Sequence, residues 1–141
     1  MHYELSKDAL DMNPRWLIIF SLVLICLITA DITLGQVDEQ YVKNAKQFIT
    51  LLAEDEYKEA VNYFDADMRQ SLSSEQLQEL WKGVQKQFGD YEEQLSTTSQ
   101  MKEGLNIVFV TCEFAIKKID MQIAFRSDMK IAGLWIVPAD L

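Results

Sequence analysis

The stretch that most limits what this chain can fold into is Leu105–Ile116, with the sequence LNIVFVTCEFAI. It is rich in β-branched and aromatic residues, which favour a strand over a helix. Alternate positions form one apolar stripe: Val108, Val110, Cys112, Phe114 and Ile116. Thr111 and Glu113 bring polar atoms to the other face, but the first half is apolar on both faces. We therefore expect a central strand that is covered on both sides or belongs to a curled sheet.

Composition restricts the class of protein. The chain has 141 residues, of which 49% are hydrophobic and 25% charged, enough for one domain with a core. Its net charge of −9 comes from 13 basic and 22 acidic residues, and no cluster of Lys or Arg suggests phosphate binding. We therefore expect no nucleic-acid partner. Cys26 and Cys112 are poorly placed to pair, and there is no CxxC motif.

The N-terminal part predicts export or anchoring. Residues 1–15 are polar, and Trp16–Ala30 carries no charge over about 22 Å of helix, shorter than a ~30 Å hydrocarbon core. This length suits a signal peptide, whereas extension to residue 35, past Asp31, suits a membrane anchor. The net charge of −1 in residues 1–15 favours an anchor.

Small residues at Thr33 and Gly35 favour cleavage before Gln36, so both alternatives stay open. A lipidated Cys26 is disfavoured because Ile25 precedes it, where a bacterial lipoprotein signal needs Gly, Ala or Ser. On either alternative we expect the following domain outside the cytoplasm, secreted or tethered to the membrane.

Three helices are predicted next, from apolar residues at helical spacing. The first runs from Gln36 to about Glu54. The second follows with Asp55 as its cap and continues to Met68. The third begins with a capping box at Ser73–Gln76 and ends at Gly89. The apolar stripes are Val37, Tyr41, Ala45, Phe48 and Leu52; Tyr57, Ala60, Val61, Phe64 and Met68; and Leu77, Leu80, Trp81, Val84 and Phe88.

The remaining residues predict a four-stranded meander. Its strands are expected at Tyr91–Ser99, Leu105–Ile116, Ile119–Arg126 and Ile131–Val137, joined by short turns and closed by Pro138. The predicted fold class is therefore α+β, with three N-terminal helices packed on a curved four-stranded antiparallel sheet. The acidic stretches Glu54–Glu56 and Glu92–Glu93 are interpreted as solvated surface.

Four segments carry a resemblance to a known family: FITLLAEDEYKEAVNYFDADM, LSSEQLQELWKGVQKQFGDYEE, NIVFVTCEF and MKIAGLWIVP. In this order they resemble DUF3887, a family of domains of unknown function, over about Val37–Pro138. The resemblance implies a domain at 36–138, a tail at 139–141 and the cone of NTF2-like, cystatin-like proteins. Relatives often precede an α/β-hydrolase domain, but this sequence has no G-x-S-x-G motif, so hydrolase activity does not transfer.

Few residues could do chemistry here. His2, the only histidine, precedes the apolar segment, so the domain has no imidazole for a triad or metal site, and we expect no cofactor or metal. Asp65 or Asp67 could act as a base with Tyr41 or Tyr63 as an acid, as isomerases of the implied superfamily do. A solvated helix end is the simpler interpretation of the aspartates. Cys112 is more typical of a small buried residue than of a nucleophile.

We expect a narrow apolar pocket inside the cone, lined by Phe48, Phe64, Trp81, Val110, Cys112, Phe125 and Trp135. Both tryptophans could instead be core residues, and a solvent-facing Trp135 would mark an interface. The preferred interpretation is a non-catalytic, extracytoplasmic binding or assembly module for a small apolar ligand or a protein. The alternatives are a small-molecule enzyme that uses an Asp/Tyr pair, and a homodimer that pairs through the exposed face of the sheet.

Overall fold

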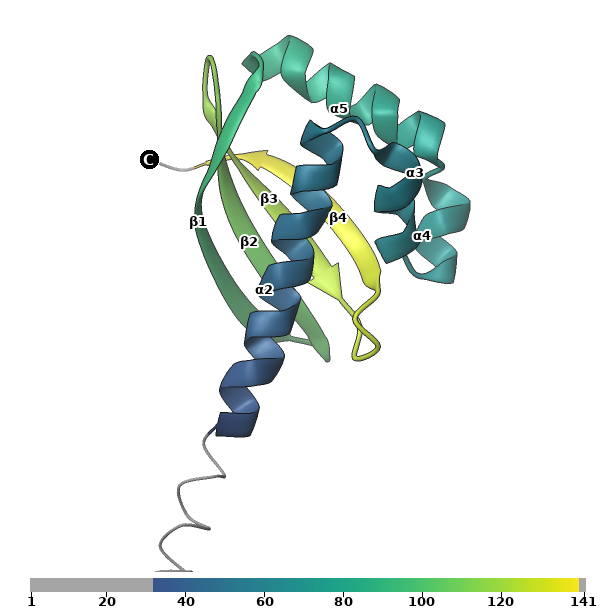
Figure 1. Cartoon of the computed structure of the whole chain (residues 1–141), viewed down its shortest axis with the longest axis vertical. Coiled ribbons are helices and arrows are strands. Elements are labelled where there is room, and N and C mark those ends of the chain that lie inside the picture. Colours follow the sequence, from purple (N-terminus) through teal and green to yellow (C-terminus); the bar gives the residue numbers. More distant parts are fainter. Residues whose placement is uncertain (1–31, 140–141) are drawn as a thin grey trace, which may run out of the picture. The chain divides into compact units, whose positions relative to one another are not determined.

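The structure is a computed structural model that describes residues 32–139, and residues 38–139 form the compact unit whose fold follows (Figure 1). The predicted polar segment 1–15, most of the predicted signal peptide or anchor at 16–35, and residues 140–141 lie outside the described residues. Within residues 32–139, no helix has both the length and the apolar character needed to cross a membrane.

The predicted fold class is confirmed: helices pack on a curved antiparallel sheet of four strands (Figure 1). The helical elements are α2 (Ile32–Ala53), α3 (Tyr57–Ala60), the 3₁₀ turn η2 (Val61–Tyr63), α4 (Ala66–Ser71) and α5 (Ser74–Phe88). The strands are β1 (Tyr91–Lys102), β2 (Leu105–Phe114), β3 (Lys118–Phe125) and β4 (Ile131–Pro138). They lie side by side in sequence order, so β1 and β4 are the two edges.

The central strand β2 divides the sheet into two faces. Every second residue from Asn106 to Phe114 is buried, while the residues between them are only partly buried. The helices cover the face that carries the buried residues, which we call the inner face. The opposite face is the outer face (Figure 1). The strand is shorter than predicted, because the chain turns after Phe114 and leaves Ile116 74% exposed.

The core lies between the inner face and the helices. On α2 the predicted stripe is buried from Tyr41 to Leu52. Aromatic rings fill the space: Phe48 lies 5.7 Å from Phe64, and Tyr41 lies 5.6 Å from Phe125, measured between ring centroids. Such contacts are typical of close-packed interiors.

Helix α5 has the ends that the sequence predicts. The Gln76 amide donates to the Ser73 hydroxyl at 3.3 Å, and the Ser73 amide donates to the Gln76 side chain at 2.9 Å, which completes a capping box. Gly89 ends the helix at φ +88°, and its amide donates to Gln85. The capping box and the glycine therefore fix both ends of α5.

The second predicted helix is wrong in its continuity. The chain forms α3 and η2, becomes extended at Phe64, and begins α4 only after Asp65. The break has a structural cause: Phe64 forms a bridge with Ile131 at the start of β4, and the Asp65 amide donates to the Ile131 carbonyl at 2.9 Å. Periodicity could not reveal this, because the competing hydrogen bond comes from residues far along the chain.

The predicted cap Asp55 is also wrong. Glu56 precedes α3, and no side chain caps that helix. Asp55 instead adopts a positive φ of 61° and accepts a hydrogen bond of 2.6 Å from the Tyr57 hydroxyl. The aspartate therefore stabilises the turn between α2 and α3 rather than the helix terminus.

Candidate binding groove

A groove with a volume of about 650 Å³ lies between one flank of α2 and the first residues of β1. We call it the α2–β1 groove. Its walls are formed by Glu39, Val42, Lys43, Lys46, Gln47 and Thr50 of α2 and by Tyr91, Glu92, Glu93 and Gln94 of β1. The helical residues form two adjacent rows with a spacing of four, 39/43/47 and 42/46/50, so they share one flank of α2. This volume lies in the range that is typical of ligand sites, roughly 300–1,000 Å³.

The position of the groove follows from the core stripe of the same helix. Tyr41, Ala45 and Phe48 are buried against the sheet, whereas Val42 and Lys46 each follow a buried residue by one position, about 100° around the helix. The buried stripe therefore fixes how α2 rotates, and that rotation turns the adjacent flank toward the edge strand β1.

Tyr91 forms the apolar wall on the strand side. Its ring lies 5.7 Å from Trp81 and 5.6 Å from Phe114, centroid to centroid, so it is held by the core on one side and faces the groove on the other. Burial raises the pKa of its phenol. The wall is therefore an uncharged ring with little freedom to move.

Gln94 joins the two walls. Its side-chain amide donates to the Lys46 carbonyl at 3.0 Å and to the Thr50 hydroxyl at 3.4 Å. Its carbonyl oxygen Oε1 is buried and has no hydrogen-bond partner among the described residues. This amide connects β1 directly to the backbone of α2 and fixes the width of the groove near Thr50.

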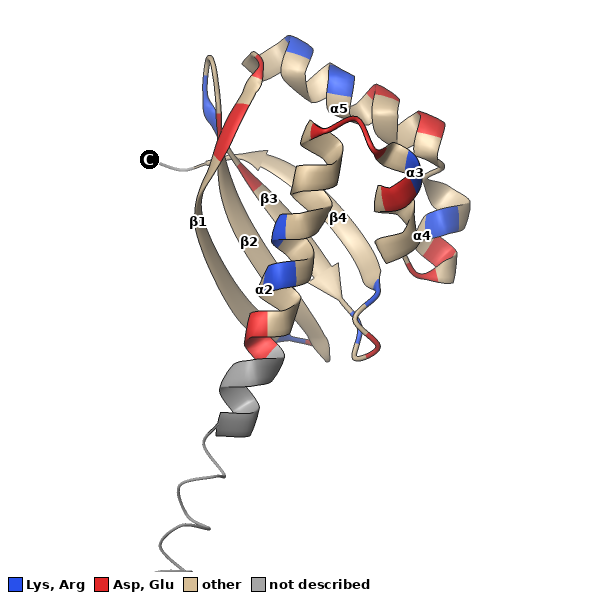
Figure 2. Ribbon diagram, in the orientation of Figure 1, with Lys and Arg blue, Asp and Glu red and all other residues tan. Residues whose placement is uncertain are grey.

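Charges of both signs line the groove. Glu39, Lys43 and Lys46 lie on α2, and Glu92 and Glu93 lie at the start of β1 (Figure 2). In residues 38–139, the ion pairs within 4.0 Å join Arg126 to Asp65 and Asp67 only. The lysines and glutamates of the groove are exposed, and no ion pair within this range occupies them, so they are available to a ligand.

The residues predicted to line a pocket lie elsewhere. Phe48, Phe64, Trp81, Val110, Cys112 and Phe125 are each at most 1% exposed and belong to the packed core. Trp135 is 52% exposed and lies on the outer face, with its ring over Gly133. Its neighbours Leu134 and Ile136 pack against the core from the inner side. None of the seven lines the α2–β1 groove.

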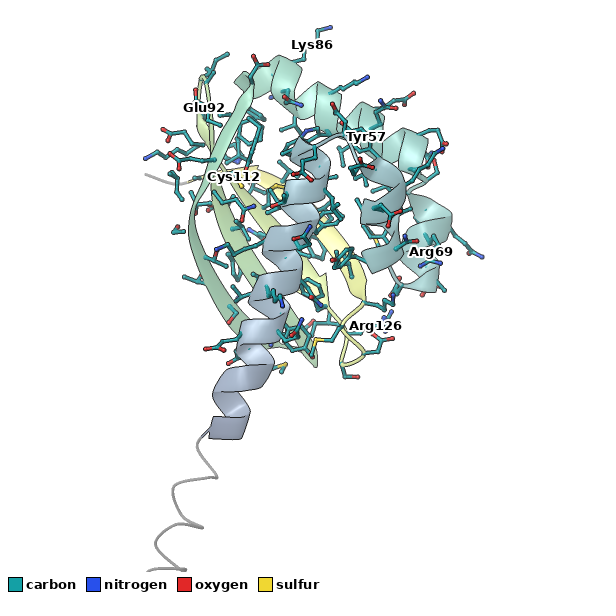
Figure 3. All side chains as sticks on the ribbon, viewed as in Figure 1. Tyr57, Arg69, Lys86, Glu92, Cys112 and Arg126 are labelled. Atoms are coloured by element: carbon teal, nitrogen blue, oxygen red, sulfur yellow. The ribbon has the colours of Figure 1, made fainter. Side chains whose placement is uncertain are left out.

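Asp65, the first candidate base, is held by two groups. Its carboxylate accepts from the Met68 amide at 2.8 Å and pairs with the Arg126 guanidinium at 2.6 Å, near the turn between β3 and β4 (Figure 3). The Met68 hydrogen bond, and then Arg126, lower the pKa of the carboxyl below its usual value. Asp67 is exposed and lies 3.9 Å from Arg126. This is the environment of a helix cap rather than of a base with a raised pKa.

The candidate acids are not paired with these aspartates. Tyr41 is buried against Phe125, and Tyr63 is partly buried with its ring 6.4 Å from Phe48. Among residues 38–139, no hydrogen bond joins Tyr41 or Tyr63 to Asp65 or Asp67. The two candidate acids are therefore not hydrogen-bonded to either candidate base in this part of the chain.

Cys112 lies on the inner face of β2 and is fully buried. Burial, with a smaller contribution from Asp120, raises the pKa of its thiol to about 12. A thiol with this pKa is almost entirely protonated at neutral pH, so its nucleophilic form is scarce. The described part of the chain also contains no group of three His, Cys, Asp or Glu residues placed to hold a metal ion.

Sequence reasoning missed the groove. Its helical residues do follow a regular spacing, but they include charged residues, which a hydrophobicity pattern assigns to solvent. Glu92 and Glu93 were assigned to solvated surface for the same reason. The signal that could have found the groove is a second flank on α2, next to the core stripe, that includes an apolar residue, Val42, between charged ones.

The fold and the groove define a small α+β domain with a surface groove at one edge of its sheet. A family model, "Protein of unknown function (DUF3887)", matches residues 45–134. This chain belongs to the DUF3887 family. Comparison with curated proteins finds no match, and comparison with solved structures finds none either.

Proposed function

We propose that this domain is a non-catalytic binding module, and that the α2–β1 groove holds a short amphipathic segment of a partner polypeptide. The observation that carries the proposal is the lining of the groove, in which the apolar residues Val42 and Tyr91 lie among charged residues of both signs from α2 and β1. A segment with an apolar centre and charges of both signs matches this arrangement.

The shape of the groove favours a polypeptide over a compact molecule. Its helical wall extends from Glu39 to Thr50, about 16 Å along the helix axis. The exposure of its charged residues shows that the groove is open to solvent along this length. Partner segments that bind beside a helix commonly place a few apolar anchors and align polar residues around them.

A non-catalytic role agrees with the chemistry of the described residues. The Asp65 carboxylate is occupied by Met68 and Arg126, and Cys112 is buried with a raised pKa. General acid and base catalysis needs a group with a pKa near the working pH and access to the substrate. Neither residue has both properties.

The proposal also includes location and ancestry. The apolar run Trp16–Ala30 supports an extracytoplasmic domain that is either secreted or tethered to the membrane. A mass measurement of the protein from its native cells would distinguish a chain cleaved before Gln36 from an uncleaved anchor. The helices packed on a curved antiparallel sheet support a relation to NTF2-like proteins.

Selection from a displayed library of random twelve-residue peptides tests the groove. The full chain would be kept in detergent because of Trp16–Ala30. We expect the enriched peptides to combine a central apolar residue with charges of both signs. Their binding should weaken at least about tenfold in Val42→Glu, since a charge would enter the apolar wall.

Val137→Glu is the matched control, because Val137 is also a partly buried valine but lies on β4, at the other edge of the sheet. Its peptide binding should equal that of the unmodified chain. Peptides that bind Val42→Glu as tightly as Val137→Glu would show that the α2–β1 groove is not the binding site.

A further inference from the structure

The outer edge of β1 is free. This strand is the first in the sheet order and pairs only with β2. Among the described residues, no backbone hydrogen bond reaches Glu92–Lys102 from any segment other than β2. A free edge presents unpaired N–H and C=O groups that can bind another strand.

Only the first part of this edge, before Ser96, is protected against the addition of another strand. The pairing of β1 with β2 is irregular between Tyr91 and Glu93 and again between Gln94 and Ser96, and bulges of this kind discourage strand addition. From Ser96 to Lys102 the register is regular. Ser96–Met101 contains neither a charge nor a proline, the other common protections of an edge.

The opposite edge provides a contrast. The first residue of β4, Ile131, is bridged by Phe64, and the strand ends at Pro138. The register of β4 is also irregular between Ala124 and Phe125 of its neighbour β3. β4 is therefore protected in ways that Ser96–Met101 is not.

We propose that two copies of this chain pair edge to edge through β1, in antiparallel orientation about a two-fold axis near Thr97 and Thr98. The four-stranded sheet would then continue into that of the second copy. Closed two-fold symmetry is the commonest arrangement of homo-oligomers. Main-chain hydrogen bonds would join Ser96–Lys102 of each copy to Glu92–Thr98 of the other, so that the regular stretch forms the centre of the contact and the bulged residues lie only at its ends.

The charges of β1 favour a second copy over an unrelated strand. Asp90, Glu92 and Glu93 lie at its beginning, Lys102 lies at its end, and the Ser96–Met101 run between them is uncharged. Antiparallel pairing about Thr97 places Lys102 of each copy opposite Glu92 of the other, at both ends of the contact. A shift of one residue at a bulge keeps Lys102 within the acidic run.

The centre of the contact is also self-complementary. Around the axis, Ser96, Thr97 and Thr98 of one copy would face the same residues of the other. Hydroxyl side chains on facing strands hydrogen-bond to each other, and such cross-strand pairs stabilise antiparallel sheets. The same sequence therefore serves as both halves of the contact.

Disulfide cross-linking tests the proposal in the full chain in detergent, with Cys26→Ser to remove the cysteine outside the described residues. The second cysteine, Cys112, is buried. Single cysteines replace Ser96, Thr97, Thr98 and Ser99 in turn, and copper phenanthroline is the oxidant. We expect cross-linked dimers to peak at Thr97→Cys or Thr98→Cys, because only residues at a two-fold axis face their own copies.

Two further variants serve as matched controls. Trp135→Cys reports pairing through the outer face, and Val137→Cys reports pairing through the β4 edge. Neither should form dimers. Cross-linking at either position without cross-linking at residues 96–99 would overturn the proposal, as would a monomer throughout the β1 series.

Charge reversal tests the register by light scattering. Lys102→Glu should weaken dimerisation about tenfold, because two cross-strand charge pairs per dimer become repulsive. Adding Glu92→Lys to this variant should restore most of the loss. Lys86→Glu on α5 is the control, because it changes the charge by the same amount away from β1. It should leave the dimer unaffected. An equal effect of Lys86→Glu and Lys102→Glu would contradict the proposed pairing.

Discussion

The packed interior and the α2–β1 groove share the helix α2 but use it in opposite ways. The interior takes the stripe with Tyr41, Ala45 and Phe48, which is almost completely buried. The groove takes the next flank, where Val42 is partly buried and Lys43 is exposed. The comparison shows that one helix supplies core packing with one flank and the wall of a groove with the other, so substitutions on the two flanks should have different effects.

Tyr91 lies at the boundary between the two regions. Its ring packs on Trp81 and Phe114 of the core and also lines the groove. Core packing therefore determines the shape of the strand wall. Variants in the interior are expected to alter the groove indirectly, whereas variants of the exposed groove residues should not disturb the interior.

The largest effect should come from removing a core tryptophan. Trp81 is 1% exposed and packs against Tyr91 and Phe114. Trp81→Ala should lower the free energy of unfolding by about 3–5 kcal/mol, through lost burial and the cavity left behind. Urea unfolding followed by circular dichroism measures this.

Trp135→Ala is the control for Trp81→Ala, since Trp135 is 52% exposed on the outer face. It should cost about 1 kcal/mol or less. Equal losses for the two tryptophans would contradict the assignment of Trp81 to the core and Trp135 to the surface.

The second effect concerns the junction between α5 and β1, which positions the strand wall of the groove. Gly89 has φ +88° and ψ 177°, and an added Cβ would lie 2.7 Å from the Cβ of Ala115. Gly89→Ala should therefore destabilise by about 1–3 kcal/mol, because only glycine adopts this conformation without strain.

Gly83 provides the control for Gly89→Ala. It is exposed within α5, and nothing lies within 4 Å of a Cβ added there. Gly83→Ala should stabilise by up to about 1 kcal/mol, because alanine is the better helix former. The additional change Ala115→Gly should relieve only the steric part of the loss in Gly89→Ala. Complete recovery would show that backbone strain contributes nothing.

The third effect separates a structural role of Asp65 from a catalytic one. Asp65→Ala removes the cap of α4 and should cost about 1–2 kcal/mol at pH 7. Asp65→Asn should cost less, because asparagine also caps helices. The remaining loss should come from the ion pair, because asparagine carries no charge to pair with Arg126. Neither change should alter peptide binding in the groove.

The pH dependence of Asp65 has a definite sign. Its folded-state pKa lies below the usual value of 3.8, so the folded protein binds a proton there less readily than the unfolded chain. The stability from the charged carboxylate is present above about pH 4 and is lost as the pH falls through the lowered pKa. The advantage of the unmodified chain over Asp65→Asn should therefore shrink as the pH decreases below about 4. An advantage that grows on acidification would contradict the ion pair.

The sequence predicted the interior well because burial leaves a periodic trace. The stripe from Tyr41 to Leu52, the alternation in β2 and the capping box of α5 all follow from local patterns. The sequence-based prediction was wrong where a residue far along the chain determines the local conformation. Phe64 is extended rather than helical because it pairs with Ile131. For the pocket, hydrophobic patterns pointed to apolar residues, and in this fold six of those seven residues pack together in the core, whereas the groove is lined by a different flank of α2.

The smallest effect on stability should come from the groove, and it provides the sharpest test of the comparison. Lys43→Glu and Lys46→Glu change exposed residues without an ion pair among residues 38–139, so each should alter the free energy of unfolding by no more than about 0.5 kcal/mol. Both should nevertheless weaken the binding of the peptides selected for the groove, because a positive charge on its α2 wall becomes negative. Lys82→Glu on α5 makes the same charge change outside the groove and should affect neither quantity. If reversal of Lys43 or Lys46 destabilised the protein as much as Asp65→Ala, the two flanks of α2 would not have separate roles.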